Sequence, residues 1–418
     1  MNVSSLSHVR GRTRCRFCGG ALQPFVDLGV SPPCESFLTE QDLDGGEAFY
    51  PLDVKICDGC WLAQLGEFVP PERIFGEYAY FSSFSKAWLE HAARYCSAMR
   101  ERFALGRDSF VLEVASNDGY LLRNFVASAV PCLGVEPAAN VAKAAIEAGV
   151  PTEVAFFGRA YAETLAASGR RADLIAGNNV LAQAPDLNDF VAGLAIALKD
   201  EGALTLEFPH LLKLMAENQF DTIYHEHFSY FSLTTVAKIF AAHGLRVFDV
   251  EELWTHGGSL RVFGCRLGAA HRESPRVGAL LRKEEEAGLT RISTYASFNR
   301  QVVETKWSLL DLLIGLKRKG KRIVGYGAPG KGNTLLNYCG VRADILDFTV
   351  DRNPYKHGRY LPGTRIPIYA PERLDAARPD YVLILPWNLR EEIVGQLAHI
   401  RGWGGRFIVP IPTPAIVE

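Results

Sequence analysis

Residues 111–119 read VLEVASNDG, and this stretch decides the fold that we expect for the 418-residue chain. Residues 111–115 form a short apolar run before a turn, which is typical of a strand buried on both faces of a parallel sheet. The apolar residues 120–122 follow the turn and predict the start of a helix. Similar short runs predict further strands at 132–136, 173–180 and 203–208. This alternation predicts an α/β domain with a doubly wound, Rossmann-like sheet, whose ligands bind at the carboxyl ends of the strands.

Polar residues at these strand ends indicate a nucleoside site. Glu136 ends a predicted strand, where an acid accepts hydrogen bonds from ribose hydroxyls. The turn after residue 114 has one glycine, whereas a turn that binds a dinucleotide carries several around the pyrophosphate. S-adenosylmethionine, a nucleoside without a pyrophosphate, therefore fits better, and the alternative is an ordinary strand–turn–helix with no ligand. The candidate cofactor-binding residues are Ala115, Asn117, Asp118, Gly119, Glu136, Pro137, Asn178 and Asn179.

A second stretch, YHEHFSYFS at residues 224–232, is dense in proton donors and acceptors. Its histidines titrate near pH ~6.5, and small environmental shifts move that value, so the stretch suits general acid/base catalysis. One alternative is an aromatic loop whose histidines only satisfy backbone groups. Another is a metal bound by His225 and His227, since alternate residues of a strand share a face.

Two C-x2-C pairs, Cys15/Cys18 and Cys57/Cys60, predict a metal site near the N-terminus. Four thiolates presented from two tight turns form a closed tetrahedral zinc site, which is structural because no coordination position stays open for chemistry. The alternative is four unrelated reduced cysteines. The acidic residues between the pairs argue against a nucleic-acid reader.

The overall composition argues against two classes of partner. A net charge of −2 gives no broad attraction to nucleic acid or anionic lipid. No apolar run approaches the ~20 residues that span a bilayer, and residues 1–14 lack the apolar core of a secretory signal. We therefore expect a cytoplasmic protein without nucleic-acid or membrane partners.

A second glycine motif lies near the C-terminus. Gly325, Gly327 and Gly330 spell G-x-G-x-x-G after a predicted strand, and Asp351 follows the next one. This pattern is typical of a dinucleotide-binding unit, and residues such as Lys331 at the helix start are natural phosphate ligands. Three alternatives stay open: a nicotinamide-dependent oxidoreductase, a lobe that binds a nucleotide without reacting it, and a purely architectural lobe.

Several motifs together resemble one family. The chain contains, in order, the paired C-x2-C, YAYFSSFS (78–85), LEVASNDGYLL (112–122), GVEP (134–137), NNVLA (178–182), YHEHFSYFS (224–232), HGGSLRVF (256–263) and YGAPGKGNTLLNYCG (326–340). This series resembles the sugar C-methyltransferases of deoxysugar biosynthesis. The resemblance implies a zinc-binding domain (1–72), a methyltransferase domain for S-adenosylmethionine (73–268) and a second Rossmann-like α/β domain (269–418) that helps bind the nucleotide sugar.

The resemblance also implies a substrate and residue roles. The expected reaction places a methyl group on C3 of a nucleotide-linked 4-ketohexose, most simply a dTDP sugar, because the ketone makes the neighbouring C3 proton acidic. His227 is the expected base, and Tyr224, or another hydroxyl of the aromatic loop, is the expected donor to the C4 oxygen. Glu226 is expected either to orient an imidazole or to bind a sugar substituent. Gln183 departs from the family, which commonly has a histidine there. The predicted substrate-binding residues are Tyr78, Gln183, His225, Arg261, Lys331 and Asn333. The alternative is a non-catalytic protein that binds nucleotide sugars.

Overall fold

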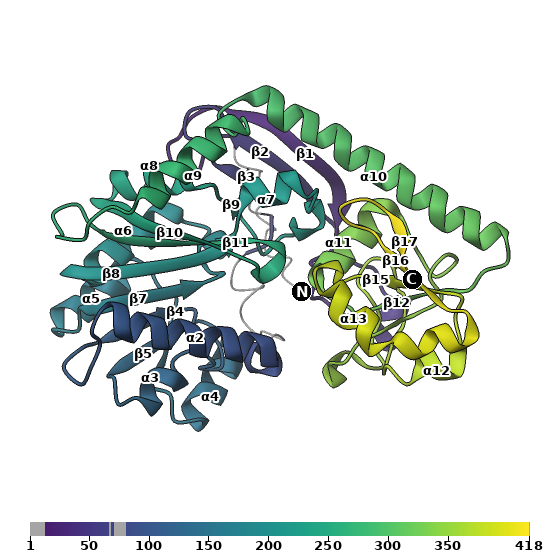
Figure 1. Ribbon diagram of the computed structural model, residues 1–418, viewed down its shortest axis with the longest axis horizontal. Coiled ribbons are helices and arrows are strands. Elements are labelled where there is room, and N and C mark those ends of the chain that lie inside the picture. Colours follow the sequence, from purple (N-terminus) through teal and green to yellow (C-terminus); the bar gives the residue numbers. More distant parts are fainter. Residues whose placement is uncertain (1–12, 67, 71–80, 418) are drawn as a thin grey trace, which may run out of the picture.

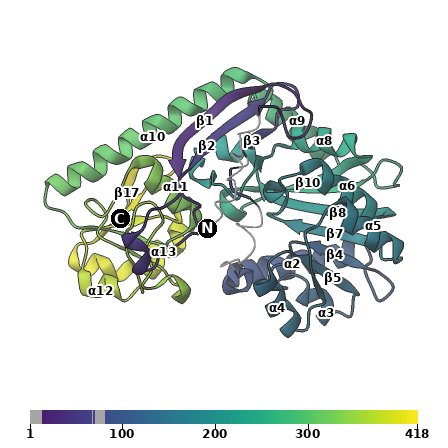
Figure 2. The ribbon, with the colours of Figure 1, turned by 180° about the vertical axis from the view of Figure 1, so that it is seen from behind.

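The computed structural model describes residues 13–66, 68–70 and 81–417, in two α/β lobes that are bridged along one side (Figure 1). The long helix α10 (Ile292–Arg318) runs from the central lobe to the C-terminal lobe, and strands β1 (Leu22–Ser31) and β2 (Tyr50–Cys57) lie beneath it (Figures 1 and 2). Among the described residues, no helix combines the length and apolar character that a membrane span requires.

The central lobe contains a seven-stranded sheet. Its strands, in spatial order, are β10 (Leu245–Leu253), β11 (Ser259–Arg266), β8 (Leu198–Pro209), β7 (Ala172–Asn178), β4 (Val111–Val114), β5 (Cys132–Glu136) and β6 (Thr152–Val154). Neighbours from β8 to β6 are parallel, and β11 is antiparallel to β8 and β10. The chain leaves β4 towards β5 and later returns to β7, so the strand order reverses beside β4. Ligands of doubly wound sheets bind at this reversal.

Helices cover this sheet, and the predicted α/β class is confirmed. They are α2 (Lys86–Arg102), α3 (Arg123–Ala127), α4 (Ala139–Glu147), α5 (Arg159–Ala167), α6 (Leu187–Ala197), α8 (Leu233–Ala242) and α9 (Pro275–Glu286). Helix α7 (Leu211–Ala216) instead packs into the core that includes the C-terminal lobe. The predicted helix start at 120–122 is wrong, because α3 begins at Arg123. Backbone φ is positive at Ala115, Asn117 and Gly119, so the chain makes a compact turn first. The apolar side chains of 120–122 are buried in that turn.

A four-stranded antiparallel sheet joins the cysteine-containing module to the central lobe. Its order is β1-β2-β3-β9, where β3 is Ala63–Leu65 and β9 is Ser229–Tyr230. Strand β9 belongs to the YHEHFSYFS stretch. The backbone N–H of Leu65 also donates to the Phe228 carbonyl at 3.0 Å, and the Phe228 N–H donates to the Ala182 carbonyl at 2.7 Å. The histidine-containing loop is therefore fixed from two sides.

The C-terminal lobe contains a six-stranded sheet, which is parallel except at its last strand. Its order is β14 (Ile368–Tyr369), β13 (Thr349–Val350), β12 (Ile323–Tyr326), β15 (Tyr381–Ile384), β16 (Arg406–Val409) and β17 (Ala415–Val417), with helices α11 (Gly330–Cys339), α12 (Arg373–Ala377) and α13 (Arg390–Gln396). One hydrophobic core joins this lobe to β1 and α10. In that core the centroid of the Phe25 ring lies 5.0 Å from that of Tyr295 and 5.4 Å from that of Phe298.

Candidate functional site

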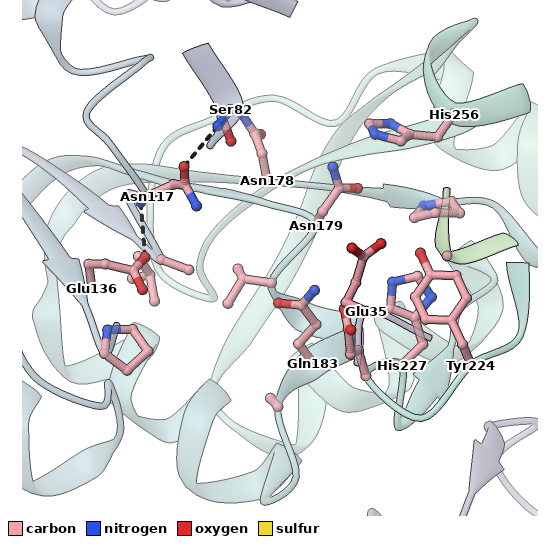
Figure 3. Close-up of a pocket in the computed structure, with 18 of the residues that line it drawn as sticks. Glu35, Ser82, Asn117, Glu136, Asn178, Asn179, Gln183, Tyr224, His227 and His256 are labelled. Carbon is pink, nitrogen blue, oxygen red and sulfur yellow. Dashed lines mark hydrogen bonds between the residues drawn. The ribbon is translucent and has the colours of Figure 1, made fainter. Parts of the chain in front are cut away.

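A cavity of about 570 Å³ opens at the carboxyl ends of β4, β5 and β7, and all three parts of the chain line it (Figure 3). The central lobe supplies Asn117 and His227, the C-terminal lobe supplies Lys331, and the cysteine-containing module supplies Glu35. This volume is that of a pocket for a small molecule. The cavity is therefore the candidate active site.

One end of the cavity has the features of a nucleoside pocket. The Glu136 side chain is buried, and its carboxylate accepts the backbone N–H groups of Asn117 at 2.9 Å and Ala138 at 2.8 Å. Burial raises the pKa of this carboxyl group. The Asn117 side-chain carbonyl accepts the N–H of Ser82 at 2.9 Å, which fixes the segment before α2 over the turn (Figure 3). Ala115, Pro137, Asn178 and Asn179 also line the cavity.

Two predicted cofactor residues do not line the cavity. Asp118 accepts hydrogen bonds from the backbone N–H and hydroxyl of Ser83, so it holds the turn against the segment before α2. Gly119 has a φ of +74°, and a Cβ there would lie 2.9 Å from the Val150 side chain. A glycine is therefore required at this position by packing and backbone geometry.

Aromatic rings that the sequence interpretation missed form the walls around this end. Trp88, Tyr120, Phe156, Phe157 and Phe190 all line the cavity. The Trp88 and Tyr120 rings stack with centroids 5.9 Å apart. The adjacent phenylalanines Phe156 and Phe157, which follow the end of β6 by two residues, were the signal in the sequence for these apolar rings.

His227 lies at the other end of the cavity with one ring nitrogen already engaged. Its Nδ1 lies 3.2 Å from the Thr222 carbonyl oxygen, which can only accept, so Nδ1 carries the proton and Nε2 has a free lone pair. The Tyr224 ring packs on the imidazole with centroids 4.2 Å apart. Burial lowers the pKa of His227 to about 4, so the imidazole is neutral at pH 7. A neutral imidazole with a free Nε2 is a competent proton acceptor.

The neighbours of His227 point in different directions. Glu226 lines the cavity, and the Cys34 thiol lies 3.8 Å from its Oε1. His225 does not line it; its Nε2 lies 3.3 Å from the carbonyl oxygens of both Tyr50 and Pro51 in β2. The two histidines therefore do not converge on one ion. In the described part of the chain, the grouping with metal-ligand geometry consists of cysteines.

The predicted substrate residues are only partly brought together. Gln183 and Lys331 line the cavity. The Asn333 side chain instead donates to the Cys34 carbonyl at 2.6 Å. Arg261 lies outside the lining, and Tyr78 lies outside the described residues. The Arg261 guanidinium forms ion pairs with two carboxylates, Glu207 at 2.7 Å and Glu251 at 2.9 Å.

The G-x-G-x-x-G turn lines the cavity at Gly330, but the cysteine-containing module packs against that glycine. A Cβ at Gly330 would lie 2.8 Å from the Cys34 sulfur and 3.5 Å from Oε1 of Glu35, so the cysteine-containing module covers the start of α11. The Asp351 carboxylate accepts two backbone N–H groups, from Ala328 at 2.6 Å and Asn353 at 2.8 Å. Gly330, at the turn that would hold a pyrophosphate, and Asp351, which would hold a ribose, therefore both have contacts within the chain.

Glu35 and Lys356 are cavity residues that the sequence interpretation missed. Glu35 lies near the middle of Figure 3, between Asn179 and Gln183, and burial raises its pKa. The Lys356 ammonium lies 3.5 Å from the Glu35 carboxylate. Glu35 is separated by roughly 150 or more residues from most of the lining, so no local pattern reveals it.

The four predicted metal ligands lie together. The ligand atoms of Cys15, Cys18, Cys57 and Cys60 are all within 4.8 Å of one another, and two sulfur pairs are 3.5 Å apart. A Zn–S bond of about 2.3 Å places tetrahedral sulfurs about 3.8 Å apart, so the cluster fits Zn²⁺. None of the four lines the cavity. A zinc ion held here has a closed shell of protein ligands and a structural role.

Three families of domains match successive parts of the chain. A family of domains described as zinc-binding matches residues 15–75, a methyltransferase domain family matches residues 88–250, and the family of C-methyltransferase C-terminal domains matches residues 254–412. The chain is 37% identical to C-methyltransferase NovU of Streptomyces niveus over 411 residues, which cover 98% of each protein.

Two solved structures each match less than half of the chain. Magnesium protoporphyrin IX methyltransferase of Synechocystis is 13% identical, with a TM-score of 0.35, and the match covers 47% of this chain and 92% of that one. YcgJ of Bacillus subtilis is 15% identical, with a TM-score of 0.34, and the match covers 44% of this chain and 100% of that one. Because these similarities are weak, the fold is described from the strand order of the chain itself.

Proposed function

We propose that this chain, which belongs to the C-methyltransferase family and is an S-adenosylmethionine-dependent enzyme, methylates C3 of a nucleotide-linked 4-ketodeoxyhexose. The observation that carries the proposal is the pairing of two sites in one cavity. A nucleoside pocket around Glu136 and a neutral imidazole, His227, line the same space. The sugar substrate comes from the motif resemblance.

The proposed reaction uses His227 as a base. Its Nε2 takes the C3 proton, the C3–H electron pair forms a C3–C4 double bond, and the carbonyl electron pair moves to the C4 oxygen. The resulting enolate attacks the methyl carbon of S-adenosylmethionine through C3, and the S–CH3 bond breaks with its electron pair staying on sulfur. Holding both substrates in one cavity supplies a large part of the acceleration, since effective molarities reach about 10⁵ M or more.

The nucleotide half of the substrate is proposed to extend towards the C-terminal lobe. Lys331 and Lys356 are the cationic residues that this lobe contributes to the cavity lining. This lobe, residues 269–418, would then assist the methyltransferase domain, residues 73–268, in holding a dTDP sugar. The direct test is to incubate dTDP-, GDP- and CDP-4-ketosugars with methyl-labelled S-adenosylmethionine and to locate the label by NMR. Label on a heteroatom, or on none of these sugars, would refute the proposal.

Glu136 is expected to contribute strongly to cofactor binding. Replacing it with glutamine removes the negative charge and puts an NH2 group against one of the two backbone N–H donors, those of Asn117 and Ala138. The carboxylate is the expected acceptor for the ribose hydroxyls of S-adenosylmethionine. Hydrogen bonds to a charged group contribute about 1.5–3 kcal/mol, so the Kd for S-adenosylmethionine should rise about tenfold or more. Titration calorimetry measures this change. Glu153→Gln, on the adjacent strand β6 but outside the lining, is the matched control and should bind normally.

The dependence of kcat/KM on pH should show the low pKa of His227. The unprotonated imidazole is the active form, and burial lowers its pKa from 6.5 to about 4. Activity should therefore stay flat as the pH falls through 6.5, and decrease only as it approaches 4. A steady-state pH profile, with the folded state checked by circular dichroism at each pH, measures this. A decrease centred near pH 6.5 would contradict it.

A further inference from the structure

His256 lies in a strained turn at the edge of the cavity. Its φ is +55°, in the left-handed region, within the turn Thr255–Gly257 that precedes β11. Such a conformation is uncommon for residues other than glycine and persists only where the surroundings impose it. Here the Thr255 hydroxyl donates to the Glu207 carboxylate at 2.9 Å, and the Gln219 side-chain amide donates to the Gly257 carbonyl at 2.6 Å.

The His256 side chain lines the cavity with unused hydrogen-bonding capacity. Its Nδ1 is buried without a partner, and no hydrogen bond joins Nε2 to any described residue. The edge of the imidazole contacts Trp88, with ring centroids 5.1 Å apart. In Figure 3 the imidazole of His256 lies at the same end of the cavity as Tyr224 and His227, away from Glu136. The strained turn thus places an imidazole with unused hydrogen-bonding capacity in the same cavity as the proposed base.

The two imidazoles differ in what they can offer a substrate. The Nδ1–H of His227 is used by the Thr222 carbonyl, so its Nε2 can only accept. Neither nitrogen of His256 has a hydrogen-bond partner in the described part of the chain, and Nδ1 is buried, so the donor available to a ligand is Nε2–H. Burial lowers the pKa of His256 to about 4, which leaves it neutral at pH 7, and a neutral imidazole still donates one hydrogen bond.

The ammonium groups on the cavity wall serve the nucleotide half of the substrate in the proposed function, and each also has partners within the chain. The Lys331 ammonium donates to the Asn388 side chain at 2.9 Å and lies 4.6 Å from the centroid of the Trp387 ring. The Lys356 ammonium donates to the Ala328 carbonyl at 2.8 Å and lies 3.5 Å from Glu35. Enolate formation also needs a hydrogen-bond donor beside the ketone oxygen, where negative charge develops.

We propose that His256 is a further catalytic residue, whose imidazole N–H donates a hydrogen bond to the C4 oxygen as the ketosugar becomes an enolate. This inference rests on the proposed function. In the step, His227 gains the C3 proton and the C4 oxygen gains the electron pair of the carbonyl bond, while His256 keeps its proton. When C3 attacks the methyl group, the C4 carbonyl re-forms and the hydrogen bond weakens again.

The test separates enolate formation from methyl transfer. The holoenzyme is incubated in D2O with S-adenosylhomocysteine and a dTDP-4-keto-6-deoxyhexose, and loss of the C3 proton is followed by NMR. Methyl transfer is measured separately with S-adenosylmethionine. The informative variants are His256→Gln and His256→Met, because both side chains are unbranched and similar in length, and both meet the same backbone strain. They differ in that glutamine carries an N–H donor.

His256→Met should slow C3 exchange and methyl transfer by the same factor, about 10²-fold or more, the effect of losing one oxyanion donor. His256→Gln should recover at least part of this loss, and Kd values for S-adenosylmethionine should stay within about threefold of the wild type. Equal losses in both variants, or methyl transfer lost with normal C3 exchange, would overturn the assignment of His256. A wild-type enzyme that neither exchanges nor methylates the probe would instead overturn the proposed function, and this inference with it.

Discussion

Replacing His227 with asparagine is expected to lower the rate of methyl transfer by about 10²- to 10⁴-fold, the usual contribution of a positioned general base. The asparagine amide can occupy the place of Nδ1 and still donate to the Thr222 carbonyl, which lies 3.2 Å from Nδ1 in the native enzyme. It has no atom at the place of Nε2. The substitution therefore removes the proton acceptor while it keeps the local hydrogen bond and the nearby Tyr224 packing.

His225→Asn is the matched control for this variant. His225 lies two residues away in the same loop and is also buried, but its ring faces the carbonyl groups of Tyr50 and Pro51. We expect it to keep most of its turnover. Binding of S-adenosylmethionine, measured by calorimetry, checks that both variants are folded. If His227→Asn turned over normally, or folded His225→Asn lost as much activity, another group would have to be the base.

Removing the zinc ion is expected to abolish activity, although the metal lies outside the cavity. A structural zinc contributes about 10–16 kcal/mol to folding, as much as the net stability of a typical protein, about 5–15 kcal/mol. Arg16, between two zinc ligands, lies over the Phe228 ring at 5.5 Å, and Leu65 of β3 donates to the Phe228 carbonyl at 3.0 Å. Loss of the metal should therefore disorder the loop that holds His227.

Cys57→Ala tests this expectation, with Cys132→Ser as the control. Cys57 is a buried member of the cluster, whereas Cys132 lies on β5 away from it. The Cys57 variant should lose bound zinc, show a Tm lower by many degrees and have no detectable methyl transfer, while the Cys132 variant keeps its zinc and its turnover. Zinc content, thermal unfolding and turnover are the measurements. A zinc-free variant with native Tm and full turnover would show that the cluster is dispensable.

Local patterns explain which predictions agree with the structure. The strand 132–136 was predicted with its observed bounds, and the four cysteine ligands were predicted from two pairs. Both depend on residues close in sequence, where side-chain periodicity and tight turns set the geometry. The start of α3 was predicted three residues early, because the turn geometry of Ala115 and Asn117 overrides the apolar pattern that follows it.

The candidate site was predicted only in part, because burial and direction depend on distant residues. The sequence does not distinguish His225 from His227, although one faces β2 and the other the cavity. Ion pairs with Glu207 and Glu251 hold the Arg261 side chain outside the cavity lining. Glu35 reaches the cavity from the zinc-binding module. His256 belongs to a glycine-containing motif, but the sequence does not predict its left-handed backbone conformation.

The sequence by itself determined the α/β class, the cysteine cluster and the order of the motifs, since each is carried by short-range spacing. Only the tertiary structure decided which side chains share one cavity. It places Glu35, His227 and His256 in one cavity, and it packs Gly330 of the glycine motif against Cys34. The physical reason is that a side chain's direction, burial and hydrogen-bond partners are set by packing between segments far apart in the chain.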